Sequence, residues 1–331
     1  MDMEQQSSSP VMRFRHISQP TDEIVKYIED RSKGLSTSLR TRWDKFNRTC
    51  MGGIEPNVLY TIAGISGSGK SSFVNSIETD LFDLNPGVPL TVLSFSFEMQ
   101  SSKQVGRKLS AKLKLTTSEL YSGDSNSKLT PDKIDAVKRE AQGIKKYDIY
   151  YVDYAGTVES IKSTIEHFQQ VVAKGRWLLV IIDHTLLIRG QAGQNERATV
   201  SELQGVLIAA RKTGRTTIIQ LSQMNRDIES SERITTHTMH FPMRKDISTS
   251  DTVYQASDYV LVIHRPELLG ITAYGIGALP TKDMIYIHFL KVRENEPKVL
   301  KFWNNLKHNT IEDVPPGDPQ DTKTEFTLSL C

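Results

Sequence analysis

The segment at 64–71 reads Gly-Ile-Ser-Gly-Ser-Gly-Lys-Ser, which is the residue spacing of a phosphate-binding loop. An apolar, strand-like run precedes it and a helical pattern follows, and this is the context that such a loop requires. Its glycines allow backbone N–H groups to turn inward around an anion at the start of a helix. We therefore expect ATP, or another NTP, to be bound with Mg²⁺ by Gly64, Ser66, Gly67, Ser68, Gly69, Lys70, Ser71 and Ser72.

Three of the expected site residues have separate chemical tasks. Lys70 is expected to reach the β and γ phosphates, and the Ser71 hydroxyl is expected to ligate Mg²⁺. Asp183 ends the apolar run 178–183 and is expected to hold a water molecule bound to the same ion. Because apolar strands that end in aspartate are common, the assignment of Asp183 depends on the phosphate loop upstream.

Two further polar side chains follow strand-like runs. Glu98 comes just after the run 91–96, and Gln223 comes just after the run 216–221. Since parallel strands end at one edge of a sheet, both side chains can face the phosphate loop. Glu98 could orient and deprotonate an attacking water, or it could be a solvated loop carboxylate. Gln223 could bind the γ phosphate and sense its loss, or it could belong to a polar turn.

These side chains must be positioned by an alternation of short apolar runs and helical patterns that begins at residue 58. The alternation predicts an α/β fold with a mainly parallel, twisted sheet and helices on both faces. The last two runs have no helix between them and predict an antiparallel hairpin at one edge. Strands are expected at 58–64, 91–96, 148–152, 178–183, 216–221, 259–264, 284–290 and 299–303, and helices at 70–80, 101–113, 131–144, 160–173 and 199–213.

Two helix starts carry capping signals. Thr21 is expected to cap a helix over 21–32, and Thr199 with Glu202 forms a capping box for the helix over 199–213. The first helix is short and carries an apolar stripe, so it must pack on its own domain or on a neighbouring subunit.

Composition limits the class of protein. The 331 residues include 41 Lys and Arg against 39 Asp and Glu, a net charge of +2, so any contact with nucleic acid must be local. Two cysteines exclude a disulfide scaffold or a Cys-rich zinc module and suit the reducing cytoplasm. The most apolar stretch, 177–188, is too short and too polar to span a bilayer. The N-terminus has no apolar core of a signal peptide.

Taken together, the motifs resemble the C-terminal motor domain of DnaB-type replicative helicases, within the RecA-like P-loop ATPases. The resemblance covers about residues 21–303. The strings that carry it, in order, are GISGSGKS, FSFEM followed by Arg107, VIID, LSQMNR with Glu229 and Arg233, QASD at 255–258, HRPE at 264–267 and KVR at 291–293.

This resemblance implies a ring, usually a hexamer, that hydrolyses NTP between subunits and moves along single-stranded DNA. By analogy Glu98 is the catalytic glutamate and Gln223 the γ-phosphate sensor, while Lys291 and Arg293 act in trans on the neighbour's nucleotide. The first helix resembles the family's linker helix, which docks on an adjacent protomer. The domains expected are a disordered tail (1–20), the linker helix (21–34), the ATPase domain (35–305) and a flexible tail (306–331).

Some features depart from the family's pattern. His184 stands where a tyrosine is usual, and the 244–251 loop carries Ser248 and Thr249 in place of an Arg-Glu pair. The expected DNA contacts are therefore Arg244, Lys245, Ser248 and Thr249. No collar domain precedes the linker helix, which would suit a phage protein acting in the host cytoplasm with a primase or loader as partner and no membrane contact.

Two other functions fit the same core. A RecA/RadA-like recombinase would form filaments on DNA, but such proteins usually have an N-terminal polymerisation strand and a Lys-x-Lys pair at the edge hairpin. A helicase-loading partner would bind nucleotide without hydrolysing it, and Glu98, Asp183 and Gln223 argue against that alternative.

Overall fold

The computed structural model describes residues 14–35, 38–124, 126–190, 193–248, 250–314 and 325–327. The chain divides into two units, 1–37 and 38–331. In the first unit, helix α1 spans Ser18–Ser32. It therefore begins before the expected cap, and Thr21 instead lies in its first turn and donates its hydroxyl to the Ile17 carbonyl at 2.8 Å. Of the tail 1–20 for which disorder is expected, residues 1–13 lie outside the described residues, and residues 18–20 belong to α1.

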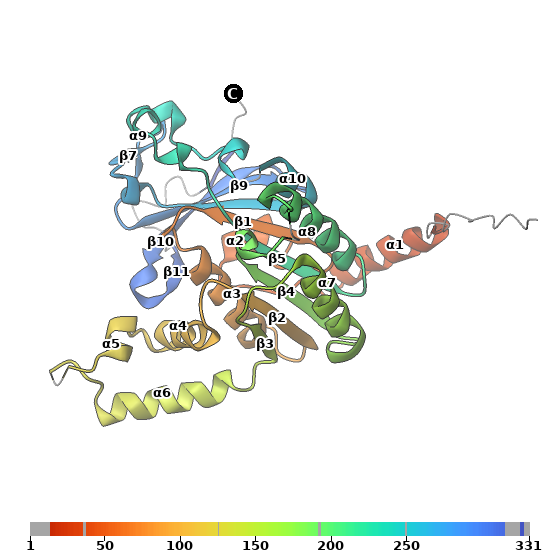
Figure 1. The fold of residues 1–331 in the computed structure, drawn as a ribbon, viewed down its shortest axis with the longest axis horizontal. Helices are drawn as coiled ribbons and strands as arrows, with labels where there is room; N and C mark the ends of the chain where they lie inside the picture. Colours follow the sequence, from red (N-terminus) through yellow and green to blue (C-terminus); the bar gives the residue numbers. More distant parts are fainter. Residues whose placement is uncertain are drawn as a thin grey trace, which may run out of the picture. The chain divides into compact units, whose positions relative to one another are not determined.

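The second unit is built around a ten-stranded sheet whose central order is β11-β10-β9-β6-β1-β5-β4-β2-β3, with β12 paired to β10 (Figure 1). The pairs of β1 with β5 and β6, of β4 with β5 and β2, and of β2 with β3 are parallel. The pairs of β9 and β10 are antiparallel. The strands are β1 Leu59–Gly64, β2 Leu90–Ser96, β3 Ile149–Val152, β4 Trp177–Asp183, β5 Thr216–Gln223, β6 Tyr259–His264, β9 Met284–Val292, β10 Lys298–Asn305, β11 Thr310–Asp313 and β12 Glu325–Thr327, and a separate hairpin pairs β7 Ala273–Tyr274 with β8 Leu279–Pro280.

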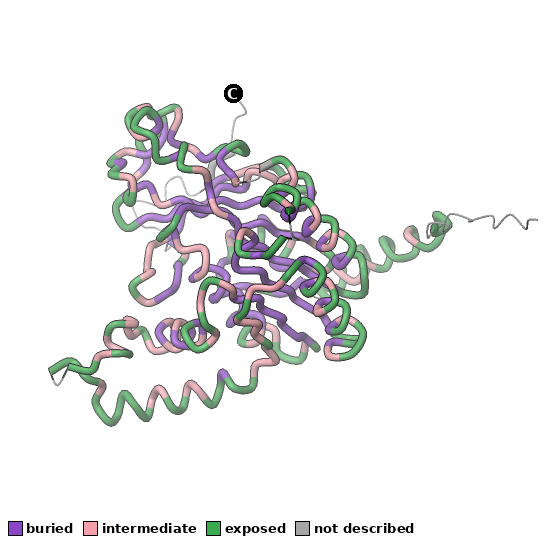
Figure 2. Tube along the Cα trace, in the orientation of Figure 1, coloured by how far each residue is buried: buried purple, intermediate pink, exposed green. Residues whose placement is uncertain are grey.

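The expected α/β class, mainly parallel sheet and antiparallel edge are thus confirmed. Because strand side chains alternate between faces, Leu179 and Ile181 of β4 pack with α2 and α3, while Val180 and Ile182 pack with α7 and α8. Figure 2 shows the resulting buried sheet between more exposed helices. The helices are α2 Asp44–Thr49, α3 Lys70–Asp83, α4 Ser101–Leu113, α5 Thr117–Tyr121, α6 Pro131–Ile144, α7 Val158–His167 with a π-helical turn at Phe168–Val172, α8 Glu196–Arg211, α9 Ser231–Thr235 and α10 Ser250–Ala256. None of the helices described is both long and apolar enough to cross a membrane.

Helix α8 begins one turn before the expected capping box, so that prediction is wrong. Asn195 is the N-cap, and its side chain accepts the Ala198 amide at 2.8 Å. Thr199 instead donates its hydroxyl to the Asn195 carbonyl at 3.1 Å. Asparagine is itself among the strongest capping residues and ranks above threonine.

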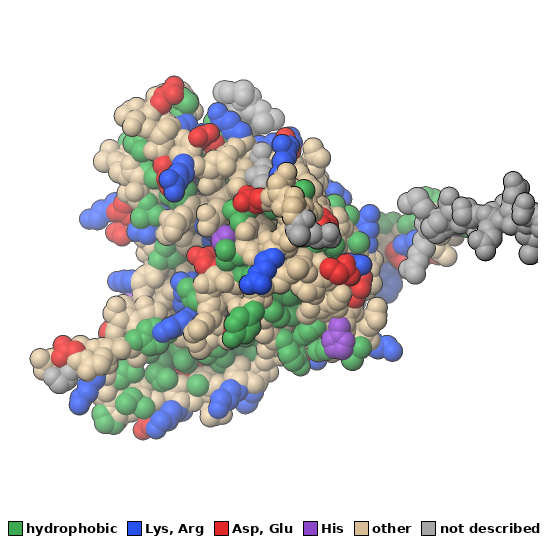
Figure 3. All heavy atoms as spheres, in the orientation of Figure 1, with side chains coloured by type: hydrophobic (Ala, Val, Ile, Leu, Met, Phe, Trp, Pro, Cys, Tyr) green, Lys and Arg blue, Asp and Glu red, His purple; other side chains and the backbone are tan. Residues whose placement is uncertain are grey.

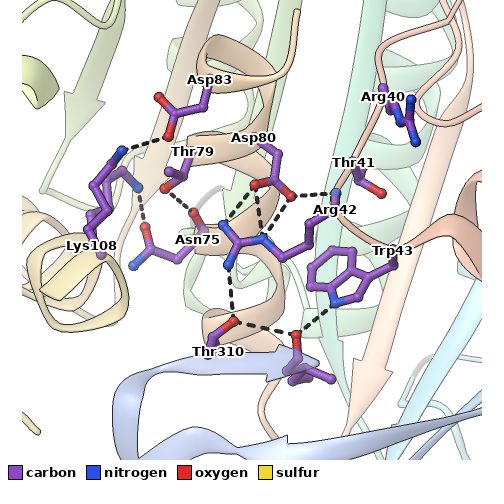
Figure 4. A network of polar contacts seen from close by, with 12 residues as sticks. Arg40, Thr41, Arg42, Trp43, Asn75, Thr79, Asp80, Asp83, Lys108 and Thr310 are labelled. Carbon is purple, nitrogen blue, oxygen red and sulfur yellow. Dashed lines mark hydrogen bonds and ion pairs between the residues drawn. The ribbon is translucent and has the colours of Figure 1, made fainter. Parts of the chain in front are cut away.

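The sheet continues past residue 305, where the sequence predicts that the domain ends and a flexible tail begins. Strand β11 pairs with β10. The Trp43 indole donates to the Ile311 carbonyl at 2.7 Å, and Arg42 donates to the Thr310 hydroxyl at 3.1 Å while it also pairs with Asp80 (Figure 4). Trp43 and Arg42 lie more than 200 positions away from β11 in the sequence, so local composition does not reveal these contacts.

Replacing Ile311 with Ala tests whether this segment belongs to the core. Ile311 is fully buried, and we expect Ile311→Ala to lower the free energy of unfolding by about 2–5 kcal/mol. Lys307→Ala, an exposed position in the same segment, serves as the control and should cost less than about 0.5 kcal/mol. Urea titration measures both; equal, small losses would contradict the packing.

Candidate active site

The phosphate loop joins the end of β1 to the start of α3. Gly67 and Gly69 have φ angles of +75° and +104°, which favour glycine. A Cβ on Gly64 would lie 2.5 Å from Ser68 Oγ and 2.6 Å from the Ile263 carbonyl oxygen, so the backbone approaches closely there. Lys70 begins α3, and its ammonium donates to the carbonyls of Gly64 and Ile65, at 2.7 and 2.9 Å. The ammonium therefore already lies against the loop.

The residues of the loop differ in exposure. Ser66 and Gly67 are exposed, whereas Ser68 is fully buried and, among the described residues, its hydroxyl has no hydrogen-bond partner. Ser71 is half-buried in the first turn of α3, and Ser72 is buried behind it. A loop of this shape, with backbone N–H groups and a lysine at a helix start, fits a phosphate chain.

The register of β2 and β4 brings the two predicted carboxylates to one place. Ser96 pairs with Asp183, and the Phe97 amide donates to the Asp183 carbonyl at 2.9 Å. Glu98 therefore lies just beyond β2, beside the end of β4. It is exposed, and its Oε2 is 4.0 Å from Nε2 of His184.

Asp183 has the electrostatic environment of an ion-binding carboxylate. It is 6% exposed, and burial, followed by the charge of Glu98, raises its pKa from 3.8 to about 6. A hydrogen bond from Ser71 and the charges of Lys70 and Arg107 act in the opposite direction. Its Oδ1 is buried and has no hydrogen-bond partner in the described part of the chain. One carboxylate and one hydroxyl beside a phosphate site fit Mg²⁺, which takes few protein ligands.

Arg107 also belongs to this site, although the sequence predicts no role for it. Burial lowers the pKa of its guanidinium, while the charges of Asp183 and Glu98 raise it. On α4 it lines a cleft of about 440 Å³ together with Lys103 and Tyr121. The only signal in the sequence was its place after the FSFEM string, and that string does not say which way the helix faces.

Gln223 lies at the same sheet edge as the phosphate loop, since it pairs in register with Gly64. Its carbonyl accepts the Ser248 amide at 2.9 Å, which links it to the predicted DNA loop. In that loop Arg244 and Lys245 are exposed, and Arg244 contacts Asp251 at 2.6 Å. Thr249 lies outside the described residues.

Lys291 and Arg293 lie at the end of β9 that is beside the amino end of β6. Lys291 pairs with Val260 at the start of β6, and β6 runs parallel to β1. Through these two pairings Lys291 is level with Thr61, three residues or about 10 Å along β1 from Gly64, and Arg293 follows further from the loop in the same direction. Both cations also lie two strands across from β1, so they are away from the phosphate loop of their own chain. Lys291 donates to the Tyr254 carbonyl at 2.8 Å, and Arg293 Nε is 2.9 Å from Asp258 Oδ1.

The raised pKa of Asp183 predicts opposite effects of pH on stability and on binding. Because the folded chain holds this proton more tightly than the unfolded chain, the contribution to stability is largest below pH 4 and is lost as pH rises through about 6. The shift corresponds to about 3 kcal/mol. Conversely, affinity for Mg²⁺-nucleotide should rise over the same interval, because Mg²⁺ requires the carboxylate.

Chemical unfolding without nucleotide and titration with a fluorescent nucleotide, each between pH 4 and 8, check these two trends. Asp183→Asn should remove both. His184 lies beside Asp183, and burial lowers its pKa, so its own contribution to stability rises as pH rises. His184→Gln should therefore keep the rise in affinity and make the fall in stability steeper. Trends that survive in Asp183→Asn would assign them to another group.

The order of the strands in the sheet, together with a phosphate loop at the carboxyl end of the parallel strand β1, defines a domain of the RecA-like class. The family model for the DnaB-like helicase C terminal domain matches residues 38–298, and the chain belongs to this family. The replicative DNA helicase DnaB of Mycobacterium leprae is 28% identical over 180 residues, 54% of this chain and 28% of that protein. That of Geobacillus stearothermophilus is 24% identical over 272 residues, 81% of this chain and 56% of that protein. The chain therefore spans at most a little more than half of the length of these relatives.

Solved structures agree on the fold. One solved structure, of an ATPase domain, superimposes with a TM-score of 0.73 at 16% identity, covering 89% of this chain and 98% of that domain. A DnaB-like replicative helicase, described with its interactions with primase, gives the same TM-score and identity and covers 89% of this chain and 66% of that one.

Proposed function

We propose that the chain is the motor of an ATP-dependent replicative DNA helicase, which hydrolyses NTP at subunit interfaces, translocates on single-stranded DNA and unwinds duplex. The observation that carries the proposal is that two sets of residues with complementary roles lie apart in the sheet. The phosphate loop, Asp183, Glu98 and Gln223 lie at the carboxyl ends of the parallel strands, whereas Lys291 and Arg293 lie at the end of β9 beside the amino end of β6. We therefore assign Lys291 and Arg293 to the nucleotide of a neighbouring copy in a ring.

Within one chain, each residue of the nucleotide site has a defined task. Lys70 donates to the β and γ phosphates, and Ser71 with Asp183 holds the ion. Mg²⁺, when bound, neutralises charge on the phosphates. Glu98 accepts the proton of the attacking water, and Gln223 hydrogen-bonds the γ phosphate.

Lys291 and Arg293 complete the site of the neighbouring chain. Arg293 is exposed, with 52% of its side chain accessible, so it can reach across an interface. A guanidinium donated in this way offsets charge on the transferring phosphoryl group and accelerates the reaction by about 10³–10⁵. Hydrolysis then depends on assembly, in a ring that we propose to be a hexamer.

The linker helix supplies a second contact between subunits in this proposal. Ile24, Val25 and Ile28 of α1 are about half exposed, at 52, 48 and 59%. An apolar stripe on a 15-residue helix requires a surface to cover it, and we assign that surface to an adjacent protomer. Primase or a loader is a further partner in the cytoplasm, the host cytoplasm for a phage protein.

The DNA grip is local. Figure 3 shows Lys and Arg side chains interspersed with Asp and Glu on one face, in keeping with the net charge of +2. We therefore assign single-strand backbone contacts to Arg244, Lys245, Ser248 and Thr249. Hydroxyls and cations of this kind position a phosphate backbone without reading its sequence.

Steady-state hydrolysis of Mg²⁺-ATP with and without single-stranded DNA tests the proposal. We expect stimulation by DNA in oligomers verified by light scattering, and unwinding of a forked duplex. The logarithm of DNA affinity should fall with the logarithm of salt concentration, with a slope of about 0.7 per phosphate contacted. Hydrolysis that is indifferent to DNA would refute the helicase, and strand exchange without unwinding would favour the recombinase.

A further inference from the structure

The end of β5 and the base of the 244–251 loop form a short antiparallel ladder, which we call the 223–248 ladder. It contains a bridge between Met224 and Ile247. Its hydrogen bonds run from Ser248 N to the Gln223 carbonyl (2.9 Å), from Asn225 N to the Asp246 carbonyl (2.6 Å) and from Asn225 Nδ2 to the Lys245 carbonyl (2.8 Å). The strand end that carries Gln223 and the segment that carries Arg244 and Lys245 are therefore joined along their backbones.

The ladder is also packed against the phosphate loop. Met224 and Ile247 are buried in one apolar cluster with Ala63 and Ile65, which flank Gly64. Ile247 is fully buried. Because close-packed interiors transmit displacement rather than absorb it, a change at the phosphate loop acts directly on the ladder.

A buried ion pair fixes the outer side of the ladder. Arg233 donates to both oxygens of Asp246, at 2.9 and 3.0 Å. The two residues are 4% and 0% exposed. Arg233 also donates to the carbonyls of Met239 and Phe241, and Asp246 accepts the Met243 amide at 2.7 Å. The pair thus attaches the segment 231–243, which connects β5 to the 244–251 loop, to the first residues of that loop.

We propose that Arg233 and Asp246 are positioning residues that make the 223–248 ladder a rigid coupler between the nucleotide and the DNA grip. With the pair intact, a displacement of Gln223 moves Arg244 and Lys245 as one body. Without it, the segment 231–243 loses its attachment and the displacement is absorbed in the loop. The inference rests on the proposed function, since it specifies how that site is regulated by DNA.

Two variants weaken the coupler to different degrees. Asp246→Asn removes one charge of the buried pair and keeps its shape. Asn225→Ala removes only the side-chain bond to the Lys245 carbonyl at a half-buried position, so it threatens folding far less. The matched control is Asp80→Asn. Asp80 lies on α3, away from the loop, and forms a similar two-pronged ion pair with Arg42, which the substitution breaks (Figure 4).

The readout is the ratio of DNA-stimulated to basal hydrolysis, with folding checked by thermal unfolding. We expect both ladder variants to keep basal turnover and to lose about fivefold or more of the stimulation. In both variants, nucleotide should also no longer change the affinity for DNA. A purely structural defect would instead leave this effect intact in the molecules that are folded. Asp80→Asn should lose stability and keep the stimulation.

The possible outcomes are distinct. Stimulation at the wild-type level in folded Asp246→Asn and Asn225→Ala would overturn the coupler while leaving the helicase in place. If Asp246→Asn does not fold, Asn225→Ala decides alone. A wild-type chain that hydrolyses ATP without any DNA effect would instead remove the proposed function, and the coupler with it.

Discussion

Glu98→Gln should lower the rate of ATP hydrolysis by about 10²–10⁴, the range that general base catalysis supplies. Glu98 is the exposed carboxylate beside Asp183 at the phosphate-loop edge, and the amide keeps its shape while it loses the ability to accept a proton. Affinity for Mg²⁺-ATP should change little, because Lys70, Ser71 and Asp183 remain. Single-turnover hydrolysis and fluorescent nucleotide binding separate the two effects.

The control for this substitution is Glu159→Gln, at an exposed position in the first turn of α7. It should leave the rate unchanged. If Glu98→Gln instead hydrolyses ATP at the wild-type rate, another group activates the water, and a protein that uses nucleotide as a structural ligand becomes the better interpretation.

Arg293→Ala should have an effect of similar or greater size, about 10³–10⁵ on hydrolysis by the assembled protein. The reason is geometric, since Arg293 lies beside the amino end of β6, away from its own phosphate loop, and we propose that it acts on a neighbour's nucleotide. Nucleotide affinity of the separated chain should therefore be unchanged. Comparing hydrolysis at concentrations above and below assembly measures this dependence.

Asp258→Asn distinguishes a role of Arg293 in the neighbour's active site from a role within its own chain. Asp258 binds both Arg293 and Arg211 and accepts the Leu59 amide at 2.9 Å. If Arg293 served only this ion-pair cluster, Asp258→Asn would reduce hydrolysis as strongly as Arg293→Ala. We expect Asp258→Asn to lose stability while each folded, assembled molecule keeps most of its turnover.

The sequence predicts well which residues lie at the end of the sheet that carries the candidate site, and the reason is physical. Apolar runs of strand length identify buried strands, and polar residues at their ends must lie at the sheet edge. Strand β6 and helices α4 and α6 have the predicted bounds. The carboxylates also lie where the strand ends indicate, since Ser96 and Asp183 are register partners. For these elements local pattern and burial agree.

Other features depend on partners that are distant in the sequence. The position of Lys291 beside the amino end of β6 follows from the antiparallel pairing of β6 with β9, which periodicity does not specify. Strand β11 is short and polar, and its buried Ile311 joins the core through residues distant in the sequence, such as Trp43. Arg107 shows the same limit for helices, because periodicity defines a face but not what that face contacts.

The central claim is that one active site is built from two copies of the chain, and mixing two inactive variants tests it most directly. A Lys70→Ala chain keeps its Arg293, and an Arg293→Ala chain keeps its phosphate loop. In rings assembled from equal amounts of both, about one interface in four joins an intact loop to an intact arginine. We predict that each variant alone is inactive and that the mixed rings regain hydrolysis. Complete inactivity of rings in which co-assembly is verified would contradict the shared site.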